Sequence, residues 1–170
     1  MSYTQPNGQP QGVAAHFTNR LREILVAEIT AINGYQRHIA SSNIEEINKA
    51  WHSIMLDEKK HYGWLLLLLR KYDPEQSKQY QAHKGKMPGP KAPIRTQGTL
   101  YDTQSILNNI REDIKGEMEA VILYEPDLMK FKQKDIIATL RSIINEEKGH
   151  AEHLTKLLLK YDPDAYDSLT

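Results

Sequence analysis

The chain has no cysteine among its 170 residues. This absence excludes disulfide bonds, zinc ribbons, iron–sulfur clusters and iron centres held by cysteines. The chain also lacks an excess of charge of either sign, because 22 Lys and Arg residues balance 22 Asp and Glu residues. No basic stretch interleaves with aromatic residues, which argues against nucleic acid as a main partner. The longest apolar run, residues 64–69, is far too short to cross a membrane.

The N-terminal end lacks the pattern of a targeting segment. Residues 1–12 are rich in Gln, Pro, Gly and Asn, with no basic start and no apolar stretch, unlike a signal peptide. We expect a disordered tail over residues 1–14, a C-terminal tail over residues 164–170, and a cytoplasmic protein. The length between the tails allows one domain with a substantial core.

Two Glu-x-x-His motifs are the most informative feature that is present. They are Glu58–His61 and Glu147–His150, and 89 positions separate them. The same offset relates further residues without any gap: Arg22-Glu23 and Arg111-Glu112, Glu28 and Glu117, Tyr35 and Tyr124, Tyr72-Asp73-Pro74 and Tyr161-Asp162-Pro163. The chain is therefore predicted to contain two copies of one helical hairpin.

Apolar periodicity predicts four helices. They are expected at about residues 15–40, 44–72, 103–124 and 135–161. Pro126 should end or kink the third helix, because a proline removes a backbone donor and clashes with the preceding turn.

The connection over residues 75–102 is unusually long and holds several Pro and Gly residues. Such a length is needed if the third helix runs parallel to the second, because the chain must then travel the length of the bundle, about 40 Å. We therefore predict an all-α, ferritin-like four-helix bundle over residues 15–163. Its hairpins, 15–74 and 103–163, would be joined by one long crossover in an up–down–down–up topology.

The spacing of the motifs predicts a metal site. Residues three apart lie on the same helix face, so Glu58 and His61 can point at one cation together. Each copy adds one further Glu, and the predicted ligands are Glu28, Glu58, His61, Glu117, Glu147 and His150. This oxygen-rich set suits iron or manganese better than structural zinc. The alternative is a decayed duplication whose site binds nothing.

The other histidines lack such partners. We predict surface positions for His16, His38, His52 and His83. His153 lies one turn past His150, where the first copy has Trp64, and a solvent-facing or supporting role is favoured over a third imidazole ligand.

The order Glu, Glu-x-x-His, Glu, Glu-x-x-His resembles the ferritin-like superfamily of di-metal carboxylate proteins. Over residues 15–162 the chain is most similar to the rubrerythrin branch, without its rubredoxin domain. The matching segments are Glu28 with Tyr35, Asp57-Glu58-x-x-His61, Glu117 with Tyr124-Glu125-Pro126, and Glu146-Glu147-x-x-His150.

The resemblance implies a role for each matching residue. Glu58 and Glu147 would bridge two metals, while Glu28 and Glu117 would be terminal ligands. His61 and His150 would each cap one metal. Tyr35 and Tyr124, the candidate catalytic residues, would hydrogen-bond ligand carboxylates across the bundle. Asp57 and Glu146 would each accept the proton of a ligand histidine and so fix its tautomer.

One departure concerns the ligand set. Rubrerythrins carry an additional Glu ligand in the third helix, and Ala120 stands three residues after Glu117 where that Glu is expected. This additional carboxylate is therefore missing unless Glu119 reorients to replace it.

The resemblance implies a non-haem di-iron oxidoreductase that reduces hydrogen peroxide or dioxygen with two iron ions per subunit, manganese being the alternative metal. Electrons would come from a separate donor or from ferrous iron, and a homodimer or larger homo-oligomer is expected. The competing functions are a ferroxidase that handles iron, a dimanganese catalase, and a structural bundle with a vestigial site.

Overall fold

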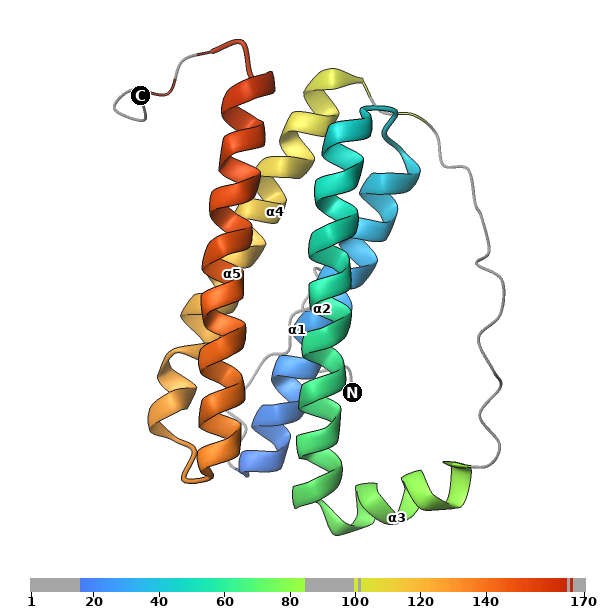
Figure 1. Ribbon diagram of the computed structural model, residues 1–170, viewed down its shortest axis with the longest axis vertical. Coiled ribbons are helices and arrows are strands. Elements are labelled where there is room, and N and C mark those ends of the chain that lie inside the picture. Colours follow the sequence, from blue (N-terminus) through green and yellow to red (C-terminus); the bar gives the residue numbers. More distant parts are fainter. Residues whose placement is uncertain (1–15, 85–99, 101, 165, 167–170) are drawn as a thin grey trace.

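The computed structural model describes residues 16–84, 100, 102–164 and 166, and every regular element within them is helical. Four long helices make up the body of the protein (Figure 1). They are α1 (Phe17–Ala40), α2 (Glu45–Tyr72), α4 (Thr103–Tyr124) and α5 (Lys134–Tyr161). The predicted all-α bundle is confirmed, and each long helix lies where the apolar periodicity predicts it.

Prolines set several helix ends. α2 ends just before Asp73-Pro74 and α5 just before Asp162-Pro163. Both aspartates have extended backbone, because the residue before a proline is disfavoured in helical conformation. Pro126 likewise follows the end of α4 and opens a short 3-10 helix, η2 (Pro126–Met129).

The sequence predicts a connection without regular structure over residues 75–102, but its first part is helical. Helix α3 (Pro74–His83) occupies this part and projects from one end of the bundle (Figure 1). The Asp73 carboxylate accepts a hydrogen bond from the Gln76 backbone nitrogen at 3.0 Å, and Pro74 stands in the first turn. Both features favour a helix start. Residues 85–99 lie outside the described residues, so the course of the crossover stays a prediction.

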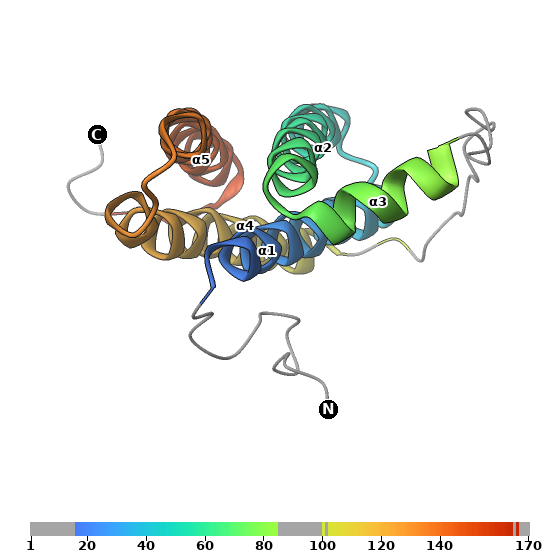
Figure 2. The same cartoon turned by 90° about the horizontal axis from the view of Figure 1, so that it is seen from below.

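The long helices form two layers (Figure 2), α1 beside α4 and α2 beside α5. Along the bundle, α1 and α5 run in one direction and α2 and α4 in the other (Figure 1). The most extensive packing lies within each hairpin, α1 with α2 and α4 with α5. The helix directions are those of the predicted up–down–down–up arrangement.

Two hydrophobic clusters form the core. One collects the N-terminal halves of α1 and α5 and the C-terminal parts of α2 and α4, with members that include Leu21, Ile24, Leu65, Tyr124, Leu140 and Ile143. The other collects the opposite ends of the same helices, with members that include Tyr35, Trp51, Ile54, Ile110 and Leu154. Each long helix therefore carries a stretch between the clusters, and the buried Glu and His residues lie in these stretches.

Ion pairs repeat across the two hairpins. Arg22 on α1 pairs with Asp73 after α2, and Arg111 on α4 pairs with Asp162 after α5. A second set joins the hairpins: Lys71 and Tyr72 contact Asp135, and Lys160 and Tyr161 contact Glu46. Every pair is related to its counterpart by the 89-residue offset. The sequence repeat is thus a repeat of contacts.

Candidate metal centre

The polar layer between the clusters is built from one lone Glu and one Glu-x-x-His per hairpin. The residues are Glu28 on α1, Glu58 and His61 on α2, Glu117 on α4, and Glu147 and His150 on α5. All six are buried. Helical spacing of three residues turns each Glu and its His toward the same side.

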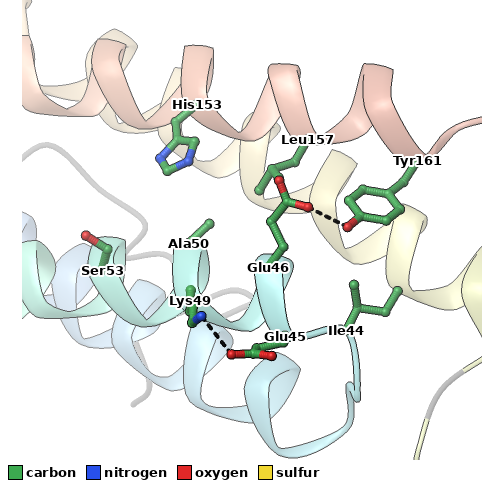
Figure 3. A pocket seen from close by; sticks show the side chains of 9 residues that line it. All are labelled: Ile44, Glu45, Glu46, Lys49, Ala50, Ser53, His153, Leu157 and Tyr161. Carbon is green, nitrogen blue, oxygen red and sulfur yellow. Dashed lines mark hydrogen bonds and ion pairs between the residues drawn. The ribbon is translucent and has the colours of Figure 1, made fainter.

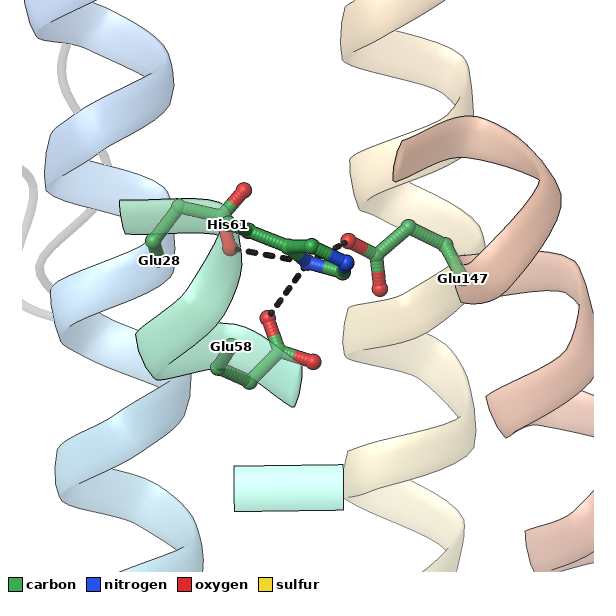
Figure 4. A group of neighbouring side chains, drawn as sticks. All are labelled: Glu28, Glu58, His61 and Glu147. Atoms are coloured by element: carbon green, nitrogen blue, oxygen red, sulfur yellow. Dashed lines mark ion pairs between the residues drawn. The ribbon is translucent and has the colours of Figure 1, made fainter. Parts of the chain in front are cut away.

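These six residues form two overlapping groups. Ligand atoms of Glu28, Glu58, His61 and Glu147 all lie within 4.8 Å of one another (Figure 4), and so do those of Glu58, Glu117, Glu147 and His150. Glu58 and Glu147 belong to both groups. The structure therefore brings together all the ligands that the sequence predicts. The two shared carboxylates are those to which the resemblance assigns the bridging role.

The imidazoles point into these groups. His61 Nδ1 lies 3.4 Å from Glu28 Oε2 and 3.2 Å from Glu147 Oε1. His150 Nδ1 lies 3.2 Å from Glu58 Oε1 and 3.3 Å from Glu117 Oε2. Each ring nitrogen thus faces oxygens from more than one helix.

Several buried atoms of the site lack a hydrogen-bond partner among the described residues. They are Glu28 Oε2, Glu58 Oε1, Glu147 Oε1 and His61 Nδ1. Buried polar atoms are normally paired, and leaving them unpaired costs free energy. A cation among them would satisfy all four at once. The donor set of carboxylates with one imidazole in each group fits iron or manganese.

Protons compete with a cation for these side chains. Burial raises the pKa of Glu28 and Glu117 well above the usual range, although the neighbouring imidazoles of His61 and His150 oppose it. Burial would also raise the pKa of Glu147, but the hydrogen bond to His150 and the nearby imidazole of His61 lower it to about 2. Burial lowers the pKa of His150, yet hydrogen bonds to Glu117 and Glu147 outweigh this and raise it to about 12. A cation that binds here must displace protons, so its affinity should fall with falling pH.

Two tyrosines bind the ligand carboxylates of the opposite hairpin. Tyr124 Oη donates to Glu28 Oε1 at 2.8 Å. Tyr35 Oη donates to Glu117 Oε1 in the same way. These bonds cross between α1 and α4, as the resemblance implies. Each tyrosine is buried, and burial raises its pKa well above 10, so the hydroxyl remains a proton donor.

Two acids lie behind the imidazoles, and each serves the histidine of the other hairpin. Glu146 Oε2 lies 3.0 Å from His61 Nε2, and Asp57 Oδ2 lies 3.4 Å from His150 Nε2. The ammonium group of Lys60 lies 2.6 Å from both acids. Sequence reasoning missed Lys60, and the Asp-x-x-Lys spacing with Asp57 is its only sequence signal.

Comparison with known proteins agrees with this geometry. The rubrerythrin family model matches residues 21–158. The chain belongs to the rubrerythrin family. A solved structure of a hypothetical protein from Pyrococcus furiosus is similar, with a TM-score of 0.65 and 24% sequence identity over 89% of this chain and 94% of that chain. Identity this low shows the fold alone. None of the curated proteins compared with the chain matches it.

Family membership and the buried Glu and His groups together point to a di-iron protein. Among the helices described for this rubrerythrin-family chain, none is long and apolar enough to cross a membrane.

A cavity of about 550 Å³ lies between α1 and α4 and reaches Glu58, Glu117 and Glu147. Its walls carry the small residues Ala27, Ala31, Gly34, Gly116 and Ala120. Ala120, at the place of the additional rubrerythrin carboxylate, therefore lines the cavity.

Glu119 does not replace that carboxylate. Its side chain is half exposed and lies 3.9 Å from Lys115, and it is not in either group of candidate ligands.

His38 is not the surface residue that the sequence predicts. Its Nδ1 lies 3.1 Å from Asp113 Oδ2, its ring lies 5.3 Å from that of Trp51, and its side chain is 14% exposed. His38 and Asp113 both line the α1/α4 cavity. Their pairing has no signal in the sequence, because the partners come from different hairpins.

The remaining histidines lie away from the metal ligands. His16, His52 and His83 are exposed, as predicted. His153 is also exposed and lines a separate open groove between α2 and α5, with Glu46, Leu157 and Tyr161 (Figure 3). His153 is not in either ligand group, which removes it as a third imidazole ligand.

Proposed function

We propose that the chain is a non-haem di-iron oxidoreductase that reduces hydrogen peroxide or dioxygen with two iron ions per subunit. The observation that carries this proposal is the overlap of two buried ligand groups at Glu58 and Glu147. A pair of shared carboxylates holds two cations close together, which one-metal structural sites do not require. The oxygen-rich donor set supports iron, with manganese as the alternative.

Each residue contributes to binding or orientation. Glu58 and Glu147 would hold both cations, while Glu28 with His61 and Glu117 with His150 would complete the two ends. The bound metal pair would supply two electrons and Lewis acidity to the oxidant. Reduction of hydrogen peroxide consumes those two electrons and two protons and yields two molecules of water.

The tyrosines and the acids behind the imidazoles would fix the ligands. Tyr124 binds one oxygen of Glu28 and Tyr35 binds one oxygen of Glu117, so the other oxygen of each carboxylate would be available to a cation. Asp57 lies 3.4 Å from His150 Nε2 and Glu146 lies 3.0 Å from His61 Nε2, so each acid would accept the Nε2 proton and leave Nδ1 for the metal.

The oxidant would enter through the α1/α4 cavity. This cavity reaches three of the ligand carboxylates, and its walls of Ala and Gly leave room for a small molecule. On the α2/α5 side, Lys60, Asp57 and Glu146 form an ion-pair network next to the histidines. We therefore propose that the oxidant reaches the metal site from the α1/α4 side.

A ferroxidase is the second candidate, and Ala120 favours it. Ala120 leaves the site without the additional carboxylate, so the ligand set is the symmetric set of six residues. An exchange of ligands at one metal, which assists peroxide chemistry, would then lack the carboxylate that it requires. Ferrous iron would then be both substrate and electron source. Under the first proposal a separate protein would donate electrons. In either case we propose a cytoplasmic homodimer or larger homo-oligomer.

Metal analysis and rapid kinetics test both candidates. Protein loaded with ferrous iron under anaerobic conditions should hold two ions per chain. Stopped-flow mixing with peroxide and with oxygen then compares the oxidation rates. Faster oxidation by peroxide supports the first proposal, and repeated oxidation of excess ferrous iron by oxygen supports the ferroxidase. If the protein does not bind metal in stoichiometric amounts, the remaining alternative is a structural bundle with a vestigial site.

A further inference from the structure

A single ammonium group lies behind both ligand histidines. Lys60 Nζ is 2.6 Å from Asp57 Oδ1 and 2.6 Å from Glu146 Oε2. Asp57 contacts His150 and Glu146 contacts His61. The contacts therefore run without a gap from one imidazole, through an acid, the lysine and the other acid, to the second imidazole.

The internal repeat is broken at this lysine. Position 149, which is equivalent to Lys60, holds glycine. Lys60 reaches an acid three residues before it and an acid on the facing helix. A lysine at position 149 would have Glu146 three residues before it and Asp57 on the facing helix. Two lysines would thus compete for the same two carboxylates, and the chain keeps one.

The position of Lys60 is well defined. Its ammonium lies 5.2 Å from the centre of the Trp64 ring, and that ring lies 5.8 Å from the His61 ring. Its side chain is 37% exposed, so as a tie between α2 and α5 it contributes little stability. A role for Lys60 is therefore to be sought in its contacts with Asp57 and Glu146 and not in the stability of the bundle.

We propose that Lys60 is a positioning residue that couples the two metal positions. By holding Asp57 and Glu146 together, it keeps both acids oriented toward the imidazole Nε2 atoms, and so keeps both Nδ1 atoms directed at the metals. The inference rests on the proposed metal site. It goes beyond that site in one respect: Asp57 and Glu146, which contact the two imidazoles, act together because both contact Lys60.

Cobalt(II) titration tests this inference without any turnover, because cobalt absorbance reports its coordination. The wild type should bind two ions. Lys60→Met, which keeps the side-chain length and removes the charge, should weaken both binding steps, by roughly 10- to 100-fold as expected for lost outer contacts. Lys59→Met is the matched control, since Lys59 is exposed and adjacent, and it should bind like the wild type.

A mutant cycle separates coupling from a general loss of structure. Asp57→Asn should weaken mainly the position of His150, and Glu146→Gln mainly that of His61. With Lys60 present, the two effects should be non-additive, because both acids contact one ammonium. In the Lys60→Met background they should add. Additive effects in both backgrounds would overturn the proposal, since a purely structural lysine produces no coupling.

Moving the lysine across the repeat completes the test. A Cβ added at Gly149 meets no atom within 4 Å, so a residue larger than glycine can start there without a clash at Cβ. Lys60→Met with Gly149→Lys should regain most of the wild-type affinity at both positions. Affinities that stay at the Lys60→Met level would overturn the inference. A wild type that binds no cobalt and no iron would instead refute the metal site itself, so the two failures are distinguishable.

Discussion

The two hairpins carry the same ligands and differ in what surrounds them. His61 lies 3.4 Å from Glu28 in the first half, and His150 lies 3.3 Å from Glu117 in the second. The cavity wall is also repeated, since Ala31 and Ala120 are equivalent positions. The candidate metal ligands, and the cavity wall next to them, thus obey the internal two-fold relation.

The outer contacts do not obey it. Lys60 is matched by Gly149, and Trp64, beside His61, is matched by the exposed His153. His38, which pairs with Asp113 at the cavity, is matched by Asp127. We therefore expect any functional difference between the two ligand groups to come from these outer residues.

The largest effect is expected from breaking the shared part of the site. Glu58→Ala or Glu147→Ala should remove most of both metals, because each carboxylate belongs to both ligand groups. Glu28→Ala, which affects one group, should retain about one ion by comparison. Metal analysis after anaerobic loading measures this. Glu119→Ala is the control and should keep two ions, and two ions in either shared-Glu variant would disprove the sharing.

Metal removal should lower stability. Metal at 100-fold above its dissociation constant stabilises the folded state by about 2.7 kcal/mol. For a chain of this size that corresponds to roughly 5–10 °C in Tm. Calorimetry of metal-free and loaded protein checks it, and equal melting temperatures would contradict a buried site.

The pH dependence of this difference has a definite sign. The pKa of Glu28 and Glu117 is raised in the folded protein, mainly by burial. Their contribution to metal-free stability is present below the usual Glu pKa and is lost as pH rises through the raised values. A bound cation removes this penalty. The gap in Tm between loaded and metal-free protein should therefore widen with rising pH.

The sequence predicts that these Glu and His side chains come together because their geometry is local. Spacing of three on a helix decides that Glu58 and His61 share a face, whatever else the chain does. The repeat then supplies the second pair. Pro126 is equally local in its effect, and α4 ends just before it.

Features that depend on contacts between helices were not predictable in this way. His38 and Asp113 are 75 positions apart, and only the rotation of α1 against α4 brings them together. Lys60 has one acid on its own helix and one on α5, so half of its environment is invisible in sequence. Helix α3 lies where the sequence predicts only a connection, because Asp73-Pro74, which follows the second predicted helix, also starts a new one.

Filling the cavity should slow oxidation without loss of metal. Ala120→Leu and Ala31→Leu add bulk at equivalent places on the two walls. If the oxidant enters here, each should slow oxidation by roughly tenfold, or about 1.4 kcal/mol in the barrier. Stopped-flow kinetics on variants with two ions bound measure it. Met118→Leu, on the exposed side of α4, is the control, and unchanged rates in both cavity variants would place the entry elsewhere.

The smallest effect is expected at the tyrosines, and it tests whether the halves differ in function. Tyr35→Phe and Tyr124→Phe each remove one hydrogen bond to a terminal Glu, at a cost of about 1 kcal/mol in stability. Both should keep the metals. Both tyrosines line the cavity, but Asp113, which pairs with His38, is among the groups that raise the pKa of Tyr35 and not among those that raise the pKa of Tyr124. Polar groups that can pass on a proton therefore lie closer to Tyr35. We expect Tyr35→Phe to slow oxidation more than Tyr124→Phe does. Equal slowing in the two variants would show that the outer asymmetry does not affect the reaction, and wild-type rates in both would make these tyrosines packing residues only.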